Sequence, residues 1–341
     1  MVRDKRTILF VKIGIAGLGF MGVTHLDAFS KILDIEVAAI SAESSRSLSG
    51  DLSQVGGNIE RPKTAYDLSG ARKYADWREL AKDPQVDIVD VCLPTDLHAP
   101  LSIAALEAGK HVLCEKPMAL TTADCERMIE AAEKHGRVLM IGQVLRFFPA
   151  YCYLEEIVRS RRYGDIQSAT FVRRCGVPDW SRWLPDESRS GGAVIDLLIH
   201  DIDQALWLFG MPDRVAAKRI GDGDTLMATF IYPNGPEVRV QGGWFPAGTP
   251  LFMGFQVRAA SAEIELGSDG LVLSDGSGNR KPIDPPGPDG YDAEIAYFVD
   301  CCRAGGRPAR CLPEESARAL KVALLLKESR AAGGEQIKCS A

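Results

Sequence analysis

The sequence predicts an α/β protein of two domains, with a parallel sheet in the first domain and a large, mainly antiparallel open sheet in the second. Short apolar runs alternate with helical patterns over the first 142 residues, as in parallel sheets with crossover helices. After about residue 145, strand patterns separated by Gly, Pro, Asn and Asp favour an antiparallel sheet. The 341 residues exceed what one core usually serves. We therefore expect domains of residues 1–143 and 144–341.

In the first domain, apolar runs predict strands and longer amphipathic patterns predict helices. The expected strands are Ile8–Ala16, Ile35–Ile40, a short one at Tyr74, Val86–Cys92, His111–Cys114 and Val138–Ile141. The expected helices are Gly22–Ile32, Trp77–Lys82, one within Pro94–Ala108, and Thr122–His135.

In the second domain, one long helix is expected over Ala193–Phe209, because two glycines precede it and Gly210 ends it. The other expected helices are Tyr151–Ser160, Tyr291–Arg303 and Pro313–Ala332. The expected strands are Ile166–Arg174, Val215–Ile220, Leu226–Tyr232, Glu237–Phe245, Phe252–Ala259, Ala262–Leu266 and Leu271–Ser274.

The composition argues against several classes of function. The formal net charge is -6 and the basic residues are scattered, so we expect no nucleic-acid partner. The most apolar early stretch contains a lysine and three glycines, so we expect no membrane span. No apolar leader follows Met1, and the nine cysteines form no CxxC motif. We expect a cytoplasmic protein with reduced thiols and no structural metal.

A glycine-rich turn follows the first predicted strand. Residues 17–22 are Gly-Leu-Gly-Phe-Met-Gly, the pattern G-x-G-x-x-G between a strand and a helix. Gly17 would allow a tight turn, Gly19 would admit a pyrophosphate, and Gly22 would let helix and strand pack closely. The helix start would offer amide donors to the phosphates. This context predicts a Rossmann dinucleotide-binding domain.

The end of the second predicted strand bears on the choice of dinucleotide. An acid at this place would hold the ribose 2′-hydroxyl of NAD, but the sequence has Ser41. The neighbouring serines with Arg46 could accept the 2′-phosphate of NADP, and Glu43 could still serve a ribose. We expect an NAD(P) cofactor, with a lean to NADP.

Glu115-Lys116-Pro117 comes just after a predicted strand of the parallel sheet. Ligands of such sheets bind at the carboxyl ends of the strands, so Lys116 would face the cleft. A surface lysine at a strand-to-helix turn is the alternative interpretation.

Asp196, His200 and Asp203 are spaced to share one face of the predicted long helix, beside an apolar stripe. Such a pair of Asp and His suits proton transfer from a substrate hydroxyl. A hydrogen-bonded structural pair is an equally weighted alternative, and a zinc site lacks further ligands.

Together these motifs resemble the Gfo/Idh/MocA oxidoreductases, which include glucose–fructose oxidoreductases and inositol dehydrogenases. The resemblance extends over nearly the whole chain, and Glu-Lys-Pro is its most specific part. Near the C-terminus it includes Tyr291-x-x-Glu294-x-x-x-Phe298. Its other segments are Gly17–Gly22, Pro94-Thr95 with His98, Ala108–Val112, Glu115–Pro117 and the helix with Asp196 and His200.

The resemblance implies roles for individual residues. Lys116 is expected to bind the reacting oxygen, His200 to act as general acid and base, and Asp196 to bind the substrate hydroxyl. Trp183, in a loop of the second domain, is a further candidate substrate contact. The expected cofactor-binding residues are Gly17, Leu18, Gly19, Phe20, Met21, Gly22, Ser41, Arg46, Leu93, Pro94, Thr95, His98, Glu115, Lys116 and Arg146.

The resemblance implies hydride transfer between the nicotinamide and a hydroxyl-bearing carbon of a sugar, cyclitol or related polyol. Alternatives are a dihydrodiol or biliverdin-type reduction, a cofactor-recycling glycoside cleavage, or a non-catalytic nucleotide-binding regulator. It also implies a homodimer or homotetramer, for which the late strands would supply an apolar face with Trp244, Phe245, Phe252 and Phe255.

Overall fold

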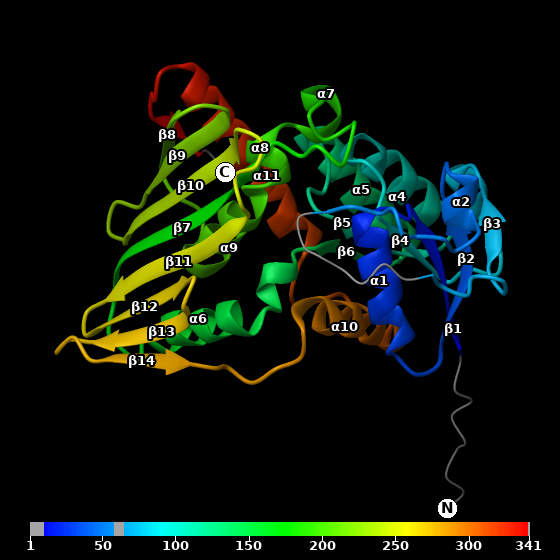
Figure 1. The fold of residues 1–341 in the computed structure, drawn as a ribbon, viewed down its shortest axis with the longest axis horizontal. Coiled ribbons are helices and arrows are strands. Elements are labelled where there is room, and N and C mark those ends of the chain that lie inside the picture. The colour runs from blue at the N-terminus through cyan, green and yellow to red at the C-terminus, as the bar shows by residue number, and fades with distance from the viewer. Residues whose placement is uncertain (1–9, 58–64, 340–341) are drawn as a thin grey trace, which may run out of the picture.

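The computed structural model describes residues 10–57 and 65–339. Two sheets lie side by side along the longest axis (Figure 1). The start of the first predicted strand, at Ile8, lies outside the described residues. None of the helices in these ranges is long and apolar enough to cross a membrane.

The first sheet is parallel, with strand order β3-β2-β1-β4-β5-β6. This order reverses direction between β1 and β4, where a crevice for ligands opens at the carboxyl ends of the strands. Its strands are β1 (Val11–Ala16), β2 (Ile35–Ser41), β3 (Arg72–Tyr74), β4 (Ile88–Val91), β5 (His111–Glu115) and β6 (Leu139–Gly142).

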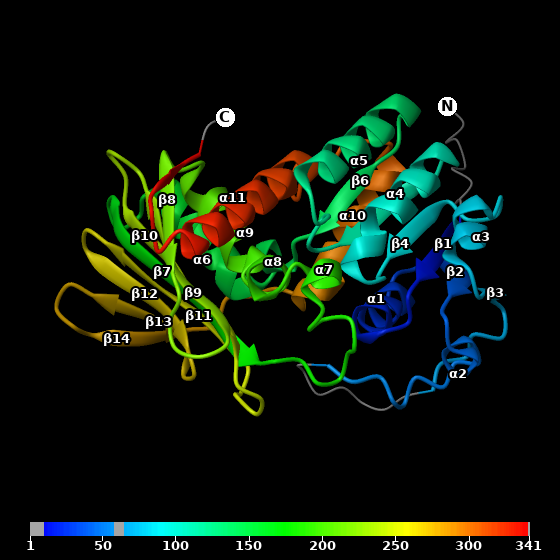
Figure 2. The same cartoon turned by 90° about the horizontal axis from the view of Figure 1, so that it is seen from above.

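Helices cover both faces of this sheet, with α4 and α5 on one face and α1 on the other (Figure 2). Local sequence signals set their ends. In α5, the Thr121 hydroxyl accepts from the Asp124 amide, and Gly136 ends the helix in the left-handed conformation. The helices are α1 (Phe20–Ser30), α2 (Ser45–Leu48), α3 (Trp77–Lys82), α4 (His98–Glu107) and α5 (Thr122–His135), with 3₁₀ turns η1 (Thr95–Leu97) and η2 (Val144–Arg146).

The second sheet is mainly antiparallel and has the strand order β14-β13-β12-β11-β7-β10-β9-β8-β15. The exception is the pair of β7 and β10, which run parallel at its centre. Its strands are β7 (Ile166–Gly176), β8 (Arg214–Lys218), β9 (Asp224–Ile231), β10 (Glu237–Phe245), β11 (Phe252–Ala259), β12 (Ala262–Gly267), β13 (Gly270–Asp275), β14 (Arg280–Ile283) and β15 (Ile337–Lys338).

Helices pack on one face of this sheet and leave the other face open (Figures 1 and 2). They are α6 (Pro149–Ser160), α8 (Ala193–Asp196), α9 (Ile199–Phe209) and α11 (Pro313–Ala331), whereas the short α7 (Glu187–Ser190) lies against η1 and α8. Trp244 and Phe255 are 4% and 2% exposed, and Phe255 packs edge-on against Tyr151 of α6. The apolar residues expected to form an oligomer face are therefore partly used by the core of the chain itself.

Two late helices tie the domains together. Although it follows the second sheet, α10 (Gly290–Ala304) packs against α1 of the first domain. The last helix, α11, contacts both α9 and α5. As a result, one buried apolar cluster runs from the first sheet into the second domain.

The prediction of one long helix over Ala193–Phe209 is wrong in one respect. The chain forms two helices, α8 and α9, with a break at Leu197 and Leu198. Neither a proline nor a glycine marks this break, so it is a product of tertiary structure rather than of local propensity.

Candidate active site

The Glu-Lys-Pro turn lies at the carboxyl end of β5 and meets the break between α8 and α9. The Lys116 ammonium donates a 2.7 Å hydrogen bond to the main-chain carbonyl of Asp196. It also lies 3.5 Å from the Asp196 carboxylate, and both side chains are 15% exposed. Two predicted residues, 80 positions apart, are thus brought together at the junction of the domains. The Lys116–Pro117 peptide bond is cis.

The helix break explains how this contact forms. In a continuous helix the Asp196 carbonyl would accept from the amide four residues later. Because α8 ends at Asp196, this carbonyl instead accepts from Lys116. The first turn of α9 then presents His200 from the other side of the break.

His200 is half-buried, and its Nδ1 has no hydrogen-bond partner among the described residues. Burial lowers its pKa well below the usual value, and the nearby positive charges of Lys116 and Arg173 lower it further. The imidazole is therefore neutral at neutral pH and has the capacity to accept a proton.

The glycine turn before α1 has the geometry that its sequence predicted. Gly17 has φ +96°, and a Cβ there would lie 2.4 Å from the Cys92 carbonyl oxygen. A Cβ on Gly22 would lie 1.9 Å from the Gly17 carbonyl oxygen, so helix and turn are in direct contact. Around Gly19 a Cβ would meet nothing within 4 Å.

The start of α1 therefore suits an anion. Gly19 is its N-cap and brings no side chain to cap the first amides, and such a helix start is a common binding place for anions. The open space above Gly19 fits a pyrophosphate, and Leu18, Phe20 and Met21 complete the turn.

At the end of β2 the structure separates the two residues expected near the ribose. Ser41 is 2% exposed, and its carbonyl accepts from the Gly17 amide, so it supports the turn from beneath. Arg46 is exposed on α2 and forms a 2.7 Å ion pair with Asp51 and a hydrogen bond to Ser53.

The turn after β4 is tied to the turn after β5 by His98. Its two ring nitrogens lie 2.8 Å from the carbonyl oxygens of Leu93 and Pro117. His98 is 1% exposed, and Thr95 beside it is 2% exposed. Both are therefore packed behind the two turns, whereas Leu93 and Pro94 are half-buried.

Arg146 and Asp203 form a buried ion pair of their own. The Arg146 guanidinium is 1% exposed and binds both oxygens of Asp203, at 2.8 and 2.7 Å. It also pairs with Glu315 and stacks on Trp207. These contacts use the guanidinium within the core, so we exclude Arg146 from the cofactor site. The same contacts occupy both oxygens of Asp203, so we assign Asp203 no role with Asp196 and His200.

The loop before α7 reaches across to the first domain. Arg189 forms a bidentate ion pair with Asp96 of η1, at 3.0 and 3.2 Å. The Trp180 side chain lies 3.2 Å from the Cβ position of Gly56. Trp183, the expected substrate contact, is half-buried in this loop. Sequence reasoning missed Asp96, because a carboxylate beside a turn gives no local sign of a partner 93 residues away.

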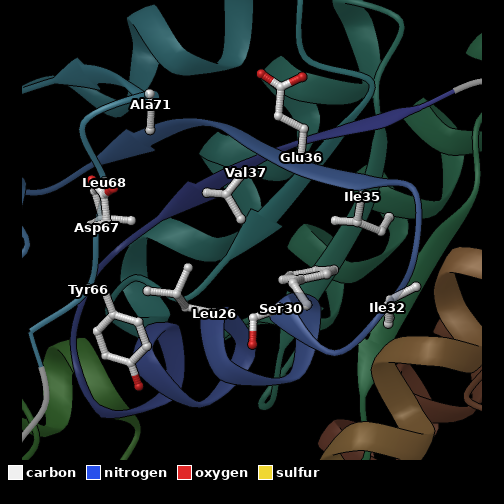
Figure 3. A pocket seen from close by; sticks show the side chains of 12 residues that line it. Leu26, Ser30, Ile32, Ile35, Glu36, Val37, Tyr66, Asp67, Leu68 and Ala71 are labelled. Carbon is white, nitrogen blue, oxygen red and sulfur yellow. The ribbon is translucent and has the colours of Figure 1, made fainter.

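Two pockets in the described part of the chain lie outside this cleft. One, of about 320 Å³, lies between α1 and β2 and includes Leu26, Val37 and Tyr66 in its lining (Figure 3). The other, of about 310 Å³, lies beside Trp207 and Arg318. Of the predicted site residues, only Arg146 borders either one.

The fold and the cleft define a two-domain oxidoreductase architecture. Residues 11–143 match the family model described as "Oxidoreductase family, NAD-binding Rossmann fold", and residues 151–263 match the "GFO/IDH/MocA C-terminal domain". The chain therefore belongs to the Gfo/Idh/MocA family of oxidoreductases.

Relatives with assigned names include dehydrogenases of cyclitols and sugars. The chain is 32% identical to inositol 2-dehydrogenase of Salmonella typhimurium over 225 residues, 65% of this chain and 62% of that protein. It is 34% identical to myo-inositol 2-dehydrogenase of Thermotoga maritima over 66% of each chain. The chain thus aligns with slightly less than two thirds of these proteins.

Solved structures share the whole fold. The aldose-aldose oxidoreductase of Caulobacter crescentus superposes with a TM-score of 0.82 at 24% identity, covering 96% of this chain and 99% of that one. A levoglucosan dehydrogenase in complex with NADH and levoglucosan gives a TM-score of 0.82 at 20% identity, covering 97% and 100%. At this level of identity the likeness concerns the fold.

Proposed function

We propose that the protein is an NAD(P)-dependent dehydrogenase that transfers a hydride between the nicotinamide and a hydroxyl-bearing carbon of a sugar, cyclitol or related polyol. The observation that carries this proposal is the contact of Lys116 with Asp196, four residues before His200, in a chain whose first domain has a glycine turn typical of dinucleotide binding. The names of the relatives, inositol 2-dehydrogenase and D-glucoside 3-dehydrogenase, support this substrate class.

In the oxidative direction, the substrate hydroxyl must lose its proton as hydride leaves the carbon. The neutral His200 imidazole accepts that proton. The Lys116 ammonium stabilises the negative charge that develops on the oxygen. Asp196 holds Lys116 through its carbonyl, and its partly exposed carboxylate is available to a substrate hydroxyl. The nicotinamide supplies only the hydride acceptor.

A preference for NADP over NAD is the finer part of this proposal. No carboxylate ends β2 to repel a 2′-phosphate, and Ser44, Ser45 and Arg46 are exposed beside it. The ion pair of Arg46 with Asp51 offsets part of the positive charge. We therefore expect the two affinities to differ by no more than about tenfold, or roughly 1.4 kcal/mol.

Assembly and compartment also remain proposals. A homodimer or homotetramer would form through the open face of the second sheet, where Met227, Gln256 and Arg258 are exposed. A cytoplasmic location is supported by nine cysteines that are all unpaired. Light scattering of the purified chain measures its oligomeric state, and a monomer would refute the proposed homodimer or homotetramer.

The test begins with binding of NADH and NADPH, measured by fluorescence. A panel of inositols, aldoses and glycosides is then followed at 340 nm with the better cofactor. Net reduction of the cofactor by at least one cyclitol or sugar is expected. Tight binding without turnover on any of them would contradict the proposal and favour a regulator.

A further inference from the structure

A group of charged side chains lies buried behind the Lys116 turn. The Nδ1 atom of His25 on α1 lies 2.9 and 3.0 Å from the two oxygens of Asp90 on β4. Its Nε2 atom lies 3.1 Å from Glu115 Oε1. His25 and Asp90 have no exposed surface, and Glu115 is 4% exposed. Among the described residues Nε2 makes no hydrogen bond, so its relation to Glu115 is electrostatic, and two carboxylates at these distances favour the positively charged ring.

Other contacts support a positively charged His25. Burial lowers the pKa of this imidazole, but Asp90 and Cys92 together outweigh burial, and the pKa lies well above the usual value. Cys92 Sγ lies 3.5 Å from His25 Nδ1 and from Asp90. Burial raises the pKa of the Cys92 thiol, so this neighbour stays neutral.

Glu294 brings a third carboxyl group to this cluster from α10. It is fully buried, and neither of its oxygens has a hydrogen-bond partner among the residues that the structure describes. Ligand atoms of Glu294, His25 and Glu115 all lie within 4.8 Å of one another. Cys311 also faces this carboxyl, and burial raises the pKa of its thiol.

Charge balance then decides the state of Glu294. With Glu294 ionised, one imidazolium would face three carboxylates inside the core, and desolvation makes such an excess very costly. Binding a proton removes one of the negative charges. Burial and the neighbouring Glu115 both raise the pKa of Glu294 well above its usual value, which agrees with this balance.

The cluster is connected directly to the lysine of the site. Glu115 Oε2 accepts a 3.1 Å hydrogen bond from the main-chain amide of Lys116. On its other side Glu115 lies against Gly142 of β6, where a Cβ would come within 3.0 Å of Oε1. The position of the Glu115 carboxylate therefore sets the direction in which the Lys116 turn leaves β5.

We propose that Glu294 is a neutral carboxylic acid beside the Glu115 carboxylate, and that this pair is a positioning device for Lys116. The device makes the docking of α10 onto α1 part of the geometry of the cleft. Its effect on turnover rests on the proposed dehydrogenase function, whereas the bound proton does not. A divalent cation held by His25, Glu115 and Glu294 is the competing occupant, since carboxylate-bound histidines also ligate metals.

The bound proton is tested by infrared spectroscopy of the full chain at neutral pH. A carbonyl stretch of a buried carboxylic acid is expected, and it should disappear in Glu294→Gln. The matched control is Glu133→Gln, an exposed glutamate on α5, which should retain the band. A band that survives in Glu294→Gln, or a stoichiometric divalent metal in the purified wild-type chain, would overturn the proposal.

The positioning role is tested by turnover. Glu294→Gln keeps a neutral donor of the same size, so its kcat should stay close to that of the wild type. Glu294→Leu removes the donor, and a displaced lysine should lower kcat by about ten- to a hundredfold with little change in cofactor affinity. Equal impairment of both variants, or a normal kcat in Glu294→Leu, would contradict the role. If Glu294→Leu does not fold, Glu294→Gln and the infrared band still decide. A wild type with the band but no dehydrogenase activity would refute only the proposed function.

Discussion

The Lys116 ammonium is bound by the main-chain carbonyl of Asp196 at 2.7 Å, more closely than by the Asp196 carboxylate at 3.5 Å. A substitution of Asp196 would therefore leave this first contact in place. The lysine is held in the cleft by the shape of the chain at a helix break, and the carboxylate remains available to a substrate hydroxyl.

Replacing Lys116 with Met should remove the donor that stabilises the reacting oxygen. We expect kcat to fall by roughly 10²–10³-fold, the usual cost of losing one such donor. Binding of NADH, followed by fluorescence, should survive. Lys134→Met, on the exposed surface of α5, is the control and should be fully active. A Lys116→Met enzyme with normal turnover would remove this residue from the mechanism.

The pH profile should report the lowered pKa of His200. The folded-state pKa lies below the usual histidine value, so the imidazole remains a base down to a lower pH than a free histidine would. For oxidation, kcat/KM should be flat from about pH 6.5 upward with respect to this group and fall only at lower pH. His200→Gln should lose this acid limb and about 10²–10⁴-fold in rate. A limb that persists in His200→Gln would show that another group accepts the proton.

Substitutions of Gly19 and Gly22 should have different effects: the first should weaken cofactor binding, and the second should lower the stability of the fold. Gly22→Ala forces a Cβ against the Gly17 carbonyl and should cost about 1–3 kcal/mol of unfolding free energy. Gly19→Ala meets open space and has an ordinary backbone conformation, so the melting temperature should hardly change. Its Cβ would enter the space proposed for the pyrophosphate and weaken NADH binding. Calorimetry and titration of both variants test this contrast, and unchanged affinity in Gly19→Ala would move the dinucleotide elsewhere.

Breaking the buried pair of Arg146 and Asp203 should destabilise the fold. Asp203→Asn leaves the buried guanidinium with less counter-charge, and breaking such pairs typically costs about 3–5 kcal/mol. Asp165→Asn breaks the exposed pair with Arg161 and should leave the melting temperature nearly unchanged. Similar melting temperatures for both variants would contradict a structural role for Arg146.

The sequence alone was sufficient for much of this architecture. Three glycines at this spacing between a strand and a helix are typical of a dinucleotide-binding turn. The expected roles of Gly17, Gly19 and Gly22 therefore came from their spacing. The place of Lys116 at the carboxyl end of a parallel strand likewise followed from the sequence, whereas its closeness to Asp196 was implied only by the family resemblance.

Other features depend on partners far away in the chain. Arg146 could equally have lined the cleft, and its real partners, Asp203 and Glu315, lie 57 and 169 positions away. The break at Leu197 has no local signal, because the residues around it favour a helix. Ser41 marks the correct strand end, but the sequence did not reveal that the turn would bury it.

The packing of α10 on α1 has a consequence for how the chain folds during synthesis. Residues 290–304 complete the surface of a domain whose sheet is already finished at Gly142. During synthesis, the surface of the first domain that α10 covers would therefore stay exposed to solvent until nearly the whole chain has been translated. A fragment ending near residue 143 should accordingly expose apolar surface and aggregate.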